Sequence, residues 1–278
     1  MKKYVKILLI SILLSSFQNC DSSKSNLDAV DVQFACSVLS DCNPNRGSKF
    51  GILGDSWTDL VFGVDAIETL RVQLTKYGGY NVVGSTLGGQ TLKTVYNTGL
   101  HYKVIDEAGP NIKYMLLSLG GNDIQGNPVT YLNNVENEKN SRFATLRENL
   151  LNLIRTGNLY KINKWGGNSI TWIIHGYDYP NPDAATGFNC RTYLVNLGFS
   201  SSDVDTFQQS ILNSYNDYLK TLTFEETTLK YIDLRGTLSG PPSKVDYMYD
   251  CIHPNSIGFR LIGERYIKTL EGYTNNER

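Results

Sequence analysis

The chain has 278 residues, with 26 Lys and Arg against 27 Asp and Glu, and therefore a formal net charge of -1. A protein that binds nucleic acid needs an excess of basic residues, so this balance argues against that class of partner. With 41% hydrophobic and 19% charged residues and no repeats, the composition excludes collagen-like, coiled-coil and disordered chains. The length allows one large domain or two small ones with a sizeable core.

The first residues have the composition of an export signal. Lys2, Lys3 and Lys6 precede an apolar run at 7–17, which is too short to span a bilayer, since about 20 residues are needed for that. We expect residues 1–19 to be a signal peptide.

The apolar run leads to Cys20, which a segment rich in Asp, Ser and Asn follows. This arrangement resembles a bacterial lipoprotein signal, in which the cysteine is lipidated and becomes the new N-terminus. The residues at 17–19 depart from the usual small-residue box, so cleavage of an ordinary secreted protein nearby is the alternative. We expect export from the bacterial cytoplasm and a lipid anchor in a cell-envelope membrane, or else a periplasmic or secreted protein, with residues 20–47 as a lipidated tether.

Four further cysteines remain if Cys20 carries lipid: Cys36, Cys42, Cys190 and Cys251. An even number in an exported protein suggests disulfides, and four cysteines permit three pairings. Cys36 and Cys42 could close a small loop, which would leave Cys190 with Cys251; free thiols are the alternative. The Cys and His spacing typical of structural zinc sites does not occur, so we expect no metal.

From residue 48 onward, short apolar runs alternate with amphipathic stretches. The expected strands are 50–53, 81–83, 112–119, 170–174 and 229–234. The expected helices are 60–76, 91–107, 141–155, 203–222 and 254–270. Runs that are apolar on both faces suit central parallel strands covered by helices. We therefore predict one α/β domain over residues 48–278, a three-layer α/β/α sandwich with a parallel sheet of about five strands.

In such a sheet the ligand site lies beyond the carboxyl ends of the strands. Short polar motifs occur there: Gly54-Asp55-Ser56, Gly88-Gly89, Gly120-Gly121-Asn122-Asp123 and, near the C-terminus, Asp250-x-x-His253. Each motif is weak by itself, because glycines often only turn the chain, a serine can be a plain helix cap and Asn-Asp can be a turn. Their occurrence together, in this order, is far more specific.

These four motifs resemble the blocks of the SGNH, or GDSL, family of serine esterases and acylhydrolases, over nearly all of residues 48–272. The resemblance implies a flavodoxin-like fold, with Ser56 as the nucleophile and Asp250 and His253 as the other members of the triad. It also implies an oxyanion hole built from Ser56, Gly89 and the side chain of Asn122, with Gly88 as the competitor of Gly89.

Chemistry supports these roles. A serine hydroxyl needs a base to take its proton, a histidine suits this near neutral pH, and a carboxylate orients the ring. Because Ser56 follows a strand, we expect it to open a helix whose free N–H groups favour negative charge. Neither a metal nor an organic cofactor is required. The G-x-S-x-G motif of α/β-hydrolases and the P-loop pattern do not occur.

The long connection at 177–202 and the residue after Ser56 offer aromatic surface for a substrate. The candidates for lining the site are Trp57, His175 and Tyr177, and further aromatic residues of the connection are Tyr179, Phe188 and Tyr193. These side chains could equally serve packing alone. A Cys190–Cys251 disulfide would tie the connection to the turn with the triad. His101 is expected on a helix surface.

The sequence thus predicts an exported serine esterase that forms an acyl-enzyme on Ser56 and acts on a lipid, a glycan or a small-molecule ester. An acyltransferase or carbohydrate deacetylase would use the same triad. A surface-binding lipoprotein on a retired hydrolase fold is the alternative from another class, and the intact set Ser56, Asn122, Asp250 and His253 argues against it.

Overall fold

The computed structural model describes residues 49–59, 67–184 and 189–275. The predicted signal peptide and tether, with Cys20, Cys36 and Cys42, lie outside the described residues, as does Phe188. None of the helices in the described part of the chain combines the length and the apolar character that crossing a membrane requires.

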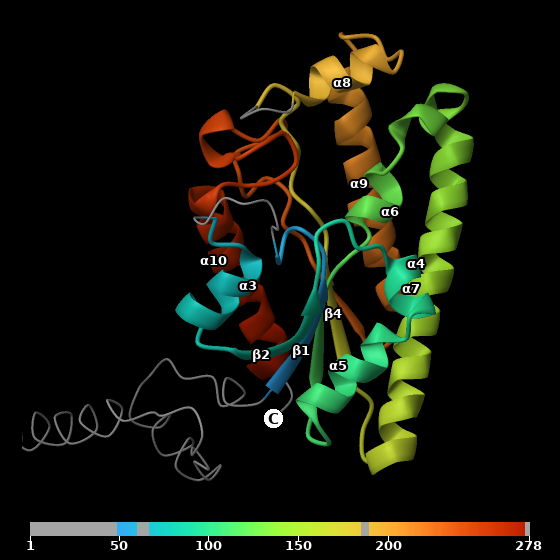
Figure 1. The fold of residues 1–278 in the computed structure, drawn as a ribbon, viewed down its shortest axis with the longest axis vertical. Helices are drawn as coiled ribbons and strands as arrows, with labels where there is room; N and C mark the ends of the chain where they lie inside the picture. Colours follow the sequence, from blue (N-terminus) through green and yellow to red (C-terminus); the bar gives the residue numbers. More distant parts are fainter. Residues whose placement is uncertain (1–48, 60–66, 185–188, 276–278) are drawn as a thin grey trace, which may run out of the picture. The chain divides into compact units, whose positions relative to one another are not determined.

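Five parallel strands form one sheet (Figure 1). In spatial order they are β2(Asn81–Thr86), β1(Lys49–Gly54), β3(Tyr114–Ser118), β4(Thr171–His175) and β5(Leu229–Ile232). The three central strands are buried along nearly their whole length, which is why their sequences are apolar on both faces. All five predicted strands are confirmed, and the carboxyl ends of parallel strands meet at one edge of the sheet.

Helices cover both faces of the sheet (Figure 1). One face carries α3(Leu70–Val72) with its continuation η1(Gln73–Tyr77), and α10(Ser256–Asn275). The other face carries α4(Leu92–Asn97), α5(Leu100–Ala108), α7(Val135–Trp165) and α9(Val204–Glu225). Four short elements complete the described chain: α6(Gly121–Gln125), η2(Pro128–Leu132), α8(Cys190–Asn196) and η3(Val245–Tyr247). The predicted α/β/α sandwich is confirmed.

Two predicted helices have different bounds in the structure. Of the helix expected at 60–76, residues 60–66 lie outside the described residues, and α3 with η1 covers Leu70–Tyr77. Residues 67–69 are not helical: the Thr69 hydroxyl donates to the Thr58 carbonyl and the Leu70 N–H to the Trp57 carbonyl. The helix expected at 91–107 is divided into α4 and α5 at Gly99, whose φ of 64° lies in the left-handed region that glycine adopts without strain. The other three expected helices are confirmed and extend further, as α7, α9 and α10.

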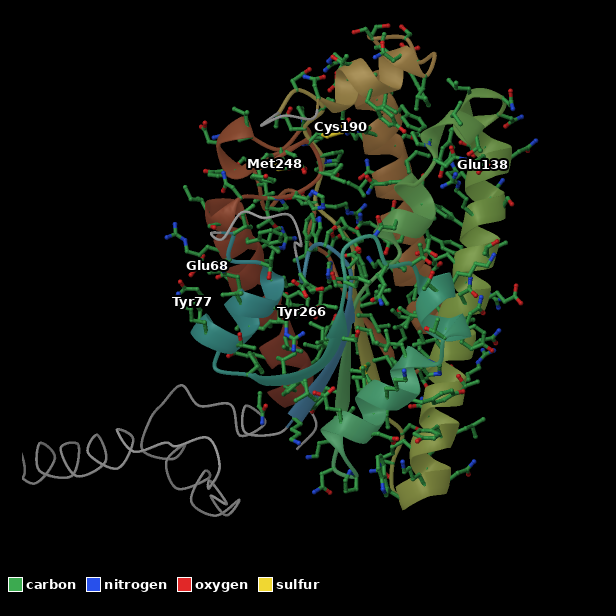
Figure 2. All side chains as sticks on the ribbon, viewed as in Figure 1. Glu68, Tyr77, Glu138, Cys190, Met248 and Tyr266 are labelled. Atoms are coloured by element: carbon green, nitrogen blue, oxygen red, sulfur yellow. A yellow bond between two sulfur atoms is a disulfide. The ribbon has the colours of Figure 1, made fainter. Side chains whose placement is uncertain are left out.

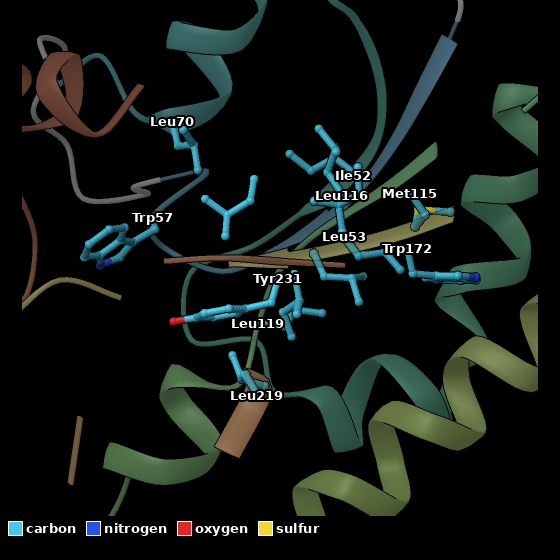
Figure 3. Close-up of a cluster of buried hydrophobic side chains, with 14 of the residues drawn as sticks. Ile52, Leu53, Trp57, Leu70, Met115, Leu116, Leu119, Trp172, Leu219 and Tyr231 are labelled. Atoms are coloured by element: carbon cyan, nitrogen blue, oxygen red, sulfur yellow. The ribbon is translucent and has the colours of Figure 1, made fainter. Parts of the chain in front are cut away.

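The hydrophobic core lies on both sides of the sheet, and Figure 3 shows Met115 and Trp172 on one side with Trp57 and Leu70 on the other. The long helix α7 approaches β4 closely because it has Gly157 where a Cβ would meet the Trp172 ring. At the next residue, the side-chain oxygen of Asn158 accepts the Trp172 indole N–H at 3.0 Å.

His101 does not lie on the surface, so that expectation is wrong. Its side chain is fully buried between α5 and α7, with Nε2 3.1 Å from the Thr156 hydroxyl. Burial lowers the pKa of His101 to about 4, which keeps the ring neutral at physiological pH. The burial of His101 could not be predicted from nearby residues, because Thr156 of α7, which covers it, lies 55 residues later in the chain.

Candidate active site

Ser56 lies in a tight turn directly after β1. The N–H groups of Thr58 and Asp59 both donate to the Asp55 carbonyl at 3.0 Å, and the chain continues without a helix up to residue 59. Gly54 is needed because a Cβ there would overlap the Thr58 side chain. The expectation that Ser56 opens a helix is therefore wrong: α3 begins at Leu70, and the local turn alone presents the Ser56 hydroxyl.

Three side chains from the two ends of the domain form a hydrogen-bonded chain. The Ser56 Oγ lies 2.7 Å from His253 Nε2, although the two residues are 197 positions apart. His253 Nδ1 lies 2.8 Å from Asp250 Oδ2. His253 is only 7% exposed, whereas Ser56 is partly open to solvent. The arrangement matches the spacing that a nucleophile, a base and an orienting carboxylate require.

Asp250 is held as an anion by its surroundings. Its second carboxylate oxygen accepts the backbone N–H groups of Ile252 at 2.9 Å and of His253 at 2.8 Å. Burial alone would raise the pKa of Asp250, but the hydrogen bond and charge of His253, together with these N–H groups, lower it below the ordinary value. The carboxylate therefore remains available to accept the His253 Nδ1–H.

Asn255 shapes the turn that carries this pair. Its side-chain oxygen accepts the N–H groups of Ile257 and Gly258 at 3.0 Å and so caps the start of α10. Its side-chain N–H donates to the Asp246 carbonyl at 2.8 Å, which closes the loop from η3 back onto the helix. The helix cap formed by Asn255 thus helps to hold His253, two residues earlier, in place.

Asp55 contributes a buried carboxylate for which the sequence predicted no role. Its oxygens accept the Trp57 N–H at 3.0 Å, the Ser118 hydroxyl at 3.3 Å and the Tyr177 hydroxyl at 2.5 Å. Burial raises the pKa of Asp55 to about 6, although these hydrogen bonds and the nearby His253 act in the opposite direction. Its place in the Gly-Asp-Ser motif was the available signal, and only Ser118 and Tyr177, the two partners from other segments, reveal what it does: Asp55 connects the end of β1 to the end of β3 and to the segment after β4.

The Gly120-Gly121-Asn122-Asp123 motif begins α6. A Cβ on Gly120 or Gly121 would collide with Tyr215 or Tyr177, respectively, so both glycines are needed for close packing. The Asn122 amide donates one N–H to the Gln90 carbonyl at 3.0 Å. Because a primary amide has two N–H groups, this bond fixes the side chain and leaves one donor for a ligand.

The two glycines of the second motif have different places in one turn. The Gln90 N–H donates to the Leu87 carbonyl at 3.1 Å, and Gly89 takes a φ of 80° at the third position, as a type II turn requires. A Cβ added to Gly88 would lie 3.9 Å from the Ser56 Cβ, so Gly88 is in contact range of the serine. Asp123 accepts the Leu92 N–H at 2.9 Å and ties this loop to α6.

A cavity of about 40 Å³ opens at Ser56. Its lining includes Trp57, Asn122, Tyr177 and His253, so two of the three aromatic candidates lie where the sequence placed them. His175 does not line this cavity, and that expectation is wrong. Its ring is fully buried behind Trp57, at 6.0 Å between ring centroids, with Nδ1 2.8 Å from the Gly176 carbonyl oxygen.

Burial also lowers the pKa of His175 to about 4. His175 is therefore a neutral core residue at physiological pH. The rings of Trp57 and Tyr177 pack against it at the end of β4. Of the remaining aromatic residues, Tyr193 lines a second, larger cavity beside the first, and Tyr179 lines a small hollow that shares Pro180 with both cavities.

The predicted pairing of Cys190 with Cys251 is confirmed, with 5.9 Å between the Cα atoms (Figure 2). Cys251 lies between Asp250 and His253 in sequence, so the disulfide connects α8 to the turn that contains these two residues. Among the described residues, no group of three or more His, Cys, Asp and Glu side chains is arranged to hold a metal ion.

No model of a protein family matches the sequence, and no curated protein matches it either. Several solved structures resemble this one, two of them as follows. The lipase Lip_vut3 from a goat rumen metagenome has a TM-score of 0.54 at 15% identity, over 81% of this chain and 98% of that chain. A G-D-S-L family protein from Desulfitobacterium hafniense has a TM-score of 0.50 at 16% identity, over 80% and 98%. The chain has the fold of the GDSL hydrolases.

This GDSL hydrolase fold confirms the flavodoxin-like α/β/α architecture that the sequence motifs implied. The same fold explains why the four polar motifs lie close together. The motifs follow β1, β2 and β3 or precede α10, and the GDSL hydrolase fold brings all four to the carboxyl edge of the sheet (Figure 1).

Proposed function

We propose that the protein is a serine ester hydrolase of the SGNH, or GDSL, family and that Ser56 carries the acyl group. The observation that supports this best is the unbroken hydrogen-bonded chain from Ser56 through His253 to Asp250. A protein that only binds ligands gains nothing from a serine hydroxyl placed 2.7 Å from a histidine that a buried carboxylate orients.

In the first half of the reaction, the Ser56 Oγ attacks the ester carbonyl while His253 Nε2 takes the hydroxyl proton. Asp250 accepts the Nδ1–H, orients the ring and stabilises the imidazolium that forms. His253 then gives the proton to the leaving alcohol oxygen, and the acyl-enzyme remains. In the second half, a water molecule loses a proton to His253 and attacks the acyl carbonyl, and the carboxylic acid leaves with regeneration of the Ser56 hydroxyl.

The negative oxygen of each tetrahedral intermediate needs fixed donors. We assign this role to the backbone N–H groups of Ser56 and Gly89 and to the free N–H of the Asn122 amide. The bond from Asn122 to the Gln90 carbonyl supports the assignment, because it orients the donor before substrate binds. Gly88, which lies against Ser56, is the alternative backbone donor to Gly89.

Short-chain nitrophenyl esters test the assignment of the nucleophile. Ser56→Ala is expected to lower kcat by about 10³-fold or more relative to the wild type. Ser210→Ala, on the exposed face of α9, is the matched control and should keep full activity. A fluorophosphonate probe should label the wild type and Ser210→Ala but not Ser56→Ala. Equal hydrolysis by Ser56→Ala and the wild type would reject Ser56 as the nucleophile.

We also propose that the protein is exported and held at a membrane by lipid on Cys20. The support is the basic and apolar pattern that precedes this cysteine. Cys20→Ser should abolish incorporation of a palmitate analogue and move the protein from the membrane fraction to the soluble fraction of the cells. Unchanged labelling and fractionation of this variant would overturn the proposal.

A further inference from the structure

A cavity of about 230 Å³ lies beside the small cavity at Ser56, between α6, η2, α8 and α9. We call it the side pocket. The two cavities share Gln125, Pro180 and Ile252 as lining residues, so a molecule at Ser56 meets the side pocket directly. Ile252 is also the residue before His253, which places the mouth of the side pocket next to the base.

The chemistry of the lining selects an apolar group. None of the described residues that line the side pocket is charged. Its deep walls are formed by Tyr131, Leu194 and Ile211, each at most 3% exposed, whereas Tyr193 and Ile252 at the rim are 40% and 37% exposed. The lining also includes the amides of Gln125, Asn127 and Gln208. A cavity of 150 Å³ with purely apolar walls holds a benzene molecule, so the volume of this one has room for about six to nine carbon atoms.

The side pocket is built in advance of any ligand. The Arg142 guanidinium donates to the carbonyls of Ile124 at 3.0 Å and Gly126 at 2.6 Å, and stacks over the Tyr131 ring at 4.7 Å. On the opposite wall, Arg191 binds Asp205 at 2.8 Å and so ties α8 to α9. Walls that are already ordered lose little conformational entropy when an apolar group enters.

Resting on the proposed function, we infer that the side pocket binds one apolar half of the ester, an acyl chain or an alcohol of about six to nine carbons. The disulfide connects this pocket to the triad, because Cys190 lines the pocket and Cys251 directly follows Asp250. The enzyme therefore prefers esters with one medium-sized apolar half over acetates of small alcohols.

Two substrate series test the inference and identify the half that binds. In ethyl esters the acyl chain grows from two to ten carbons; in acetates the alcohol grows from ethyl to benzyl and octyl. For the half that occupies the side pocket, kcat/KM is expected to rise about three- to fourfold per added methylene until the pocket is full. The other series should rise much less.

Two neighbouring glutamines of α9 provide a matched pair of variants. Gln208 lines the side pocket, whereas Gln209 lines only the small hollow next to it that Tyr179 also lines, and both are partly buried. Gln208→Trp should fill the pocket and reduce the ratio of kcat/KM between the longest and shortest esters of the sensitive series at least tenfold. Gln209→Trp should leave that ratio as in the wild type. A ratio that does not change in Gln208→Trp, or flat series in the wild type, would overturn the inference.

Direct binding separates this inference from the proposed function. If none of the esters is cleaved, the proposed function fails. Whether the side pocket binds an apolar group is still tested by ligand-observed NMR with 4-ethylphenol, which has no ester bond. Binding by the wild type and Gln209→Trp, with loss in Gln208→Trp, supports an apolar site. Absence of binding to the wild type rejects it.

Discussion

Trp57 donates its indole N–H to the backbone carbonyl of Ile252 at 3.1 Å. Trp57 directly follows Ser56, and Ile252 directly precedes His253, so this bond joins the neighbours of the serine and the histidine across 195 positions of the chain. The Trp57 ring is held in turn by edge contacts with Tyr177 and Phe259, at 4.9 and 5.8 Å between centroids. We infer that Trp57 is a positioning residue for the Ser56–His253 pair.

Trp57→Phe is expected to keep the aromatic packing and lose the hydrogen bond. A bond of this kind contributes about 1 kcal/mol, and loss of alignment adds to that, so kcat on nitrophenyl esters should fall about tenfold with a small change in KM. Trp165→Phe, at the far end of α7, is the control and should retain the wild-type kcat. Similar kcat values for both variants would show that the bond does not position the pair.

Asp250→Asn should lower kcat by about 10³- to 10⁴-fold, because an amide cannot accept the His253 Nδ1–H and stabilise the imidazolium in the way a carboxylate does. The backbone N–H groups of Ile252 and His253 can still donate to the amide oxygen, so the variant is expected to fold. Thermal unfolding should therefore remain cooperative while ester hydrolysis is lost. A loss of less than tenfold would remove Asp250 from the triad.

Asn122→Ala removes one proposed oxyanion donor. We expect kcat to fall about 10²- to 10³-fold while KM for the same ester changes little, because the donor acts on charge that develops in the transition state. The rate of labelling by a fluorophosphonate should decrease in parallel. An increase in KM alone would instead indicate that Asn122 binds the substrate in its ground state.

Replacement of both Cys190 and Cys251 by serine should lower the free energy of unfolding by about 2–4 kcal/mol, since the disulfide closes a segment of 61 residues. Because Cys251 lies between Asp250 and His253 in sequence, kcat should also fall at temperatures where the variant remains folded. Denaturant titration and ester hydrolysis at 15 °C measure the two effects separately. Peptide mapping that found another cysteine pairing in the wild type would contradict this prediction.

Asp55→Asn should change the pH dependence of stability. The carboxyl titrates near 3.8 when exposed and at about 6 in the folded chain, so the folded state binds more protons between these values. Its contribution to stability is therefore present at low pH and is lost as the pH rises through 6. Relative to the wild type, the variant should gain up to about 3 kcal/mol of unfolding free energy between pH 4 and pH 7. Asp250 is common to both proteins, so its opposite pH dependence cancels in this difference.

Much of the fold follows from local patterns. The central strands could be predicted because a strand covered on both faces must be apolar at nearly every position, as in the run from Tyr114 to Ser118. The start of α3 at Leu70 could not, because Thr69, which the amphipathic pattern places inside a helix, donates its hydroxyl to the Thr58 carbonyl instead. Likewise, the burial of His101 and His175 depends on α7 and on Trp57, which are distant in sequence.

The alternation of strands and helices can be predicted from the amino-acid sequence, and so can the motifs that contain Ser56, Gly89, Asn122, Asp250 and His253, because these signals lie in residue types and short spacings. Three features are visible only in the folded chain: Ser56 lies in a turn that is not helical, Asp55 is a buried carboxyl, and an apolar pocket lies beside the cavity at the serine. Each of these depends on side chains that approach from separate segments, and the distances between them exist only once the sheet has brought its carboxyl ends together.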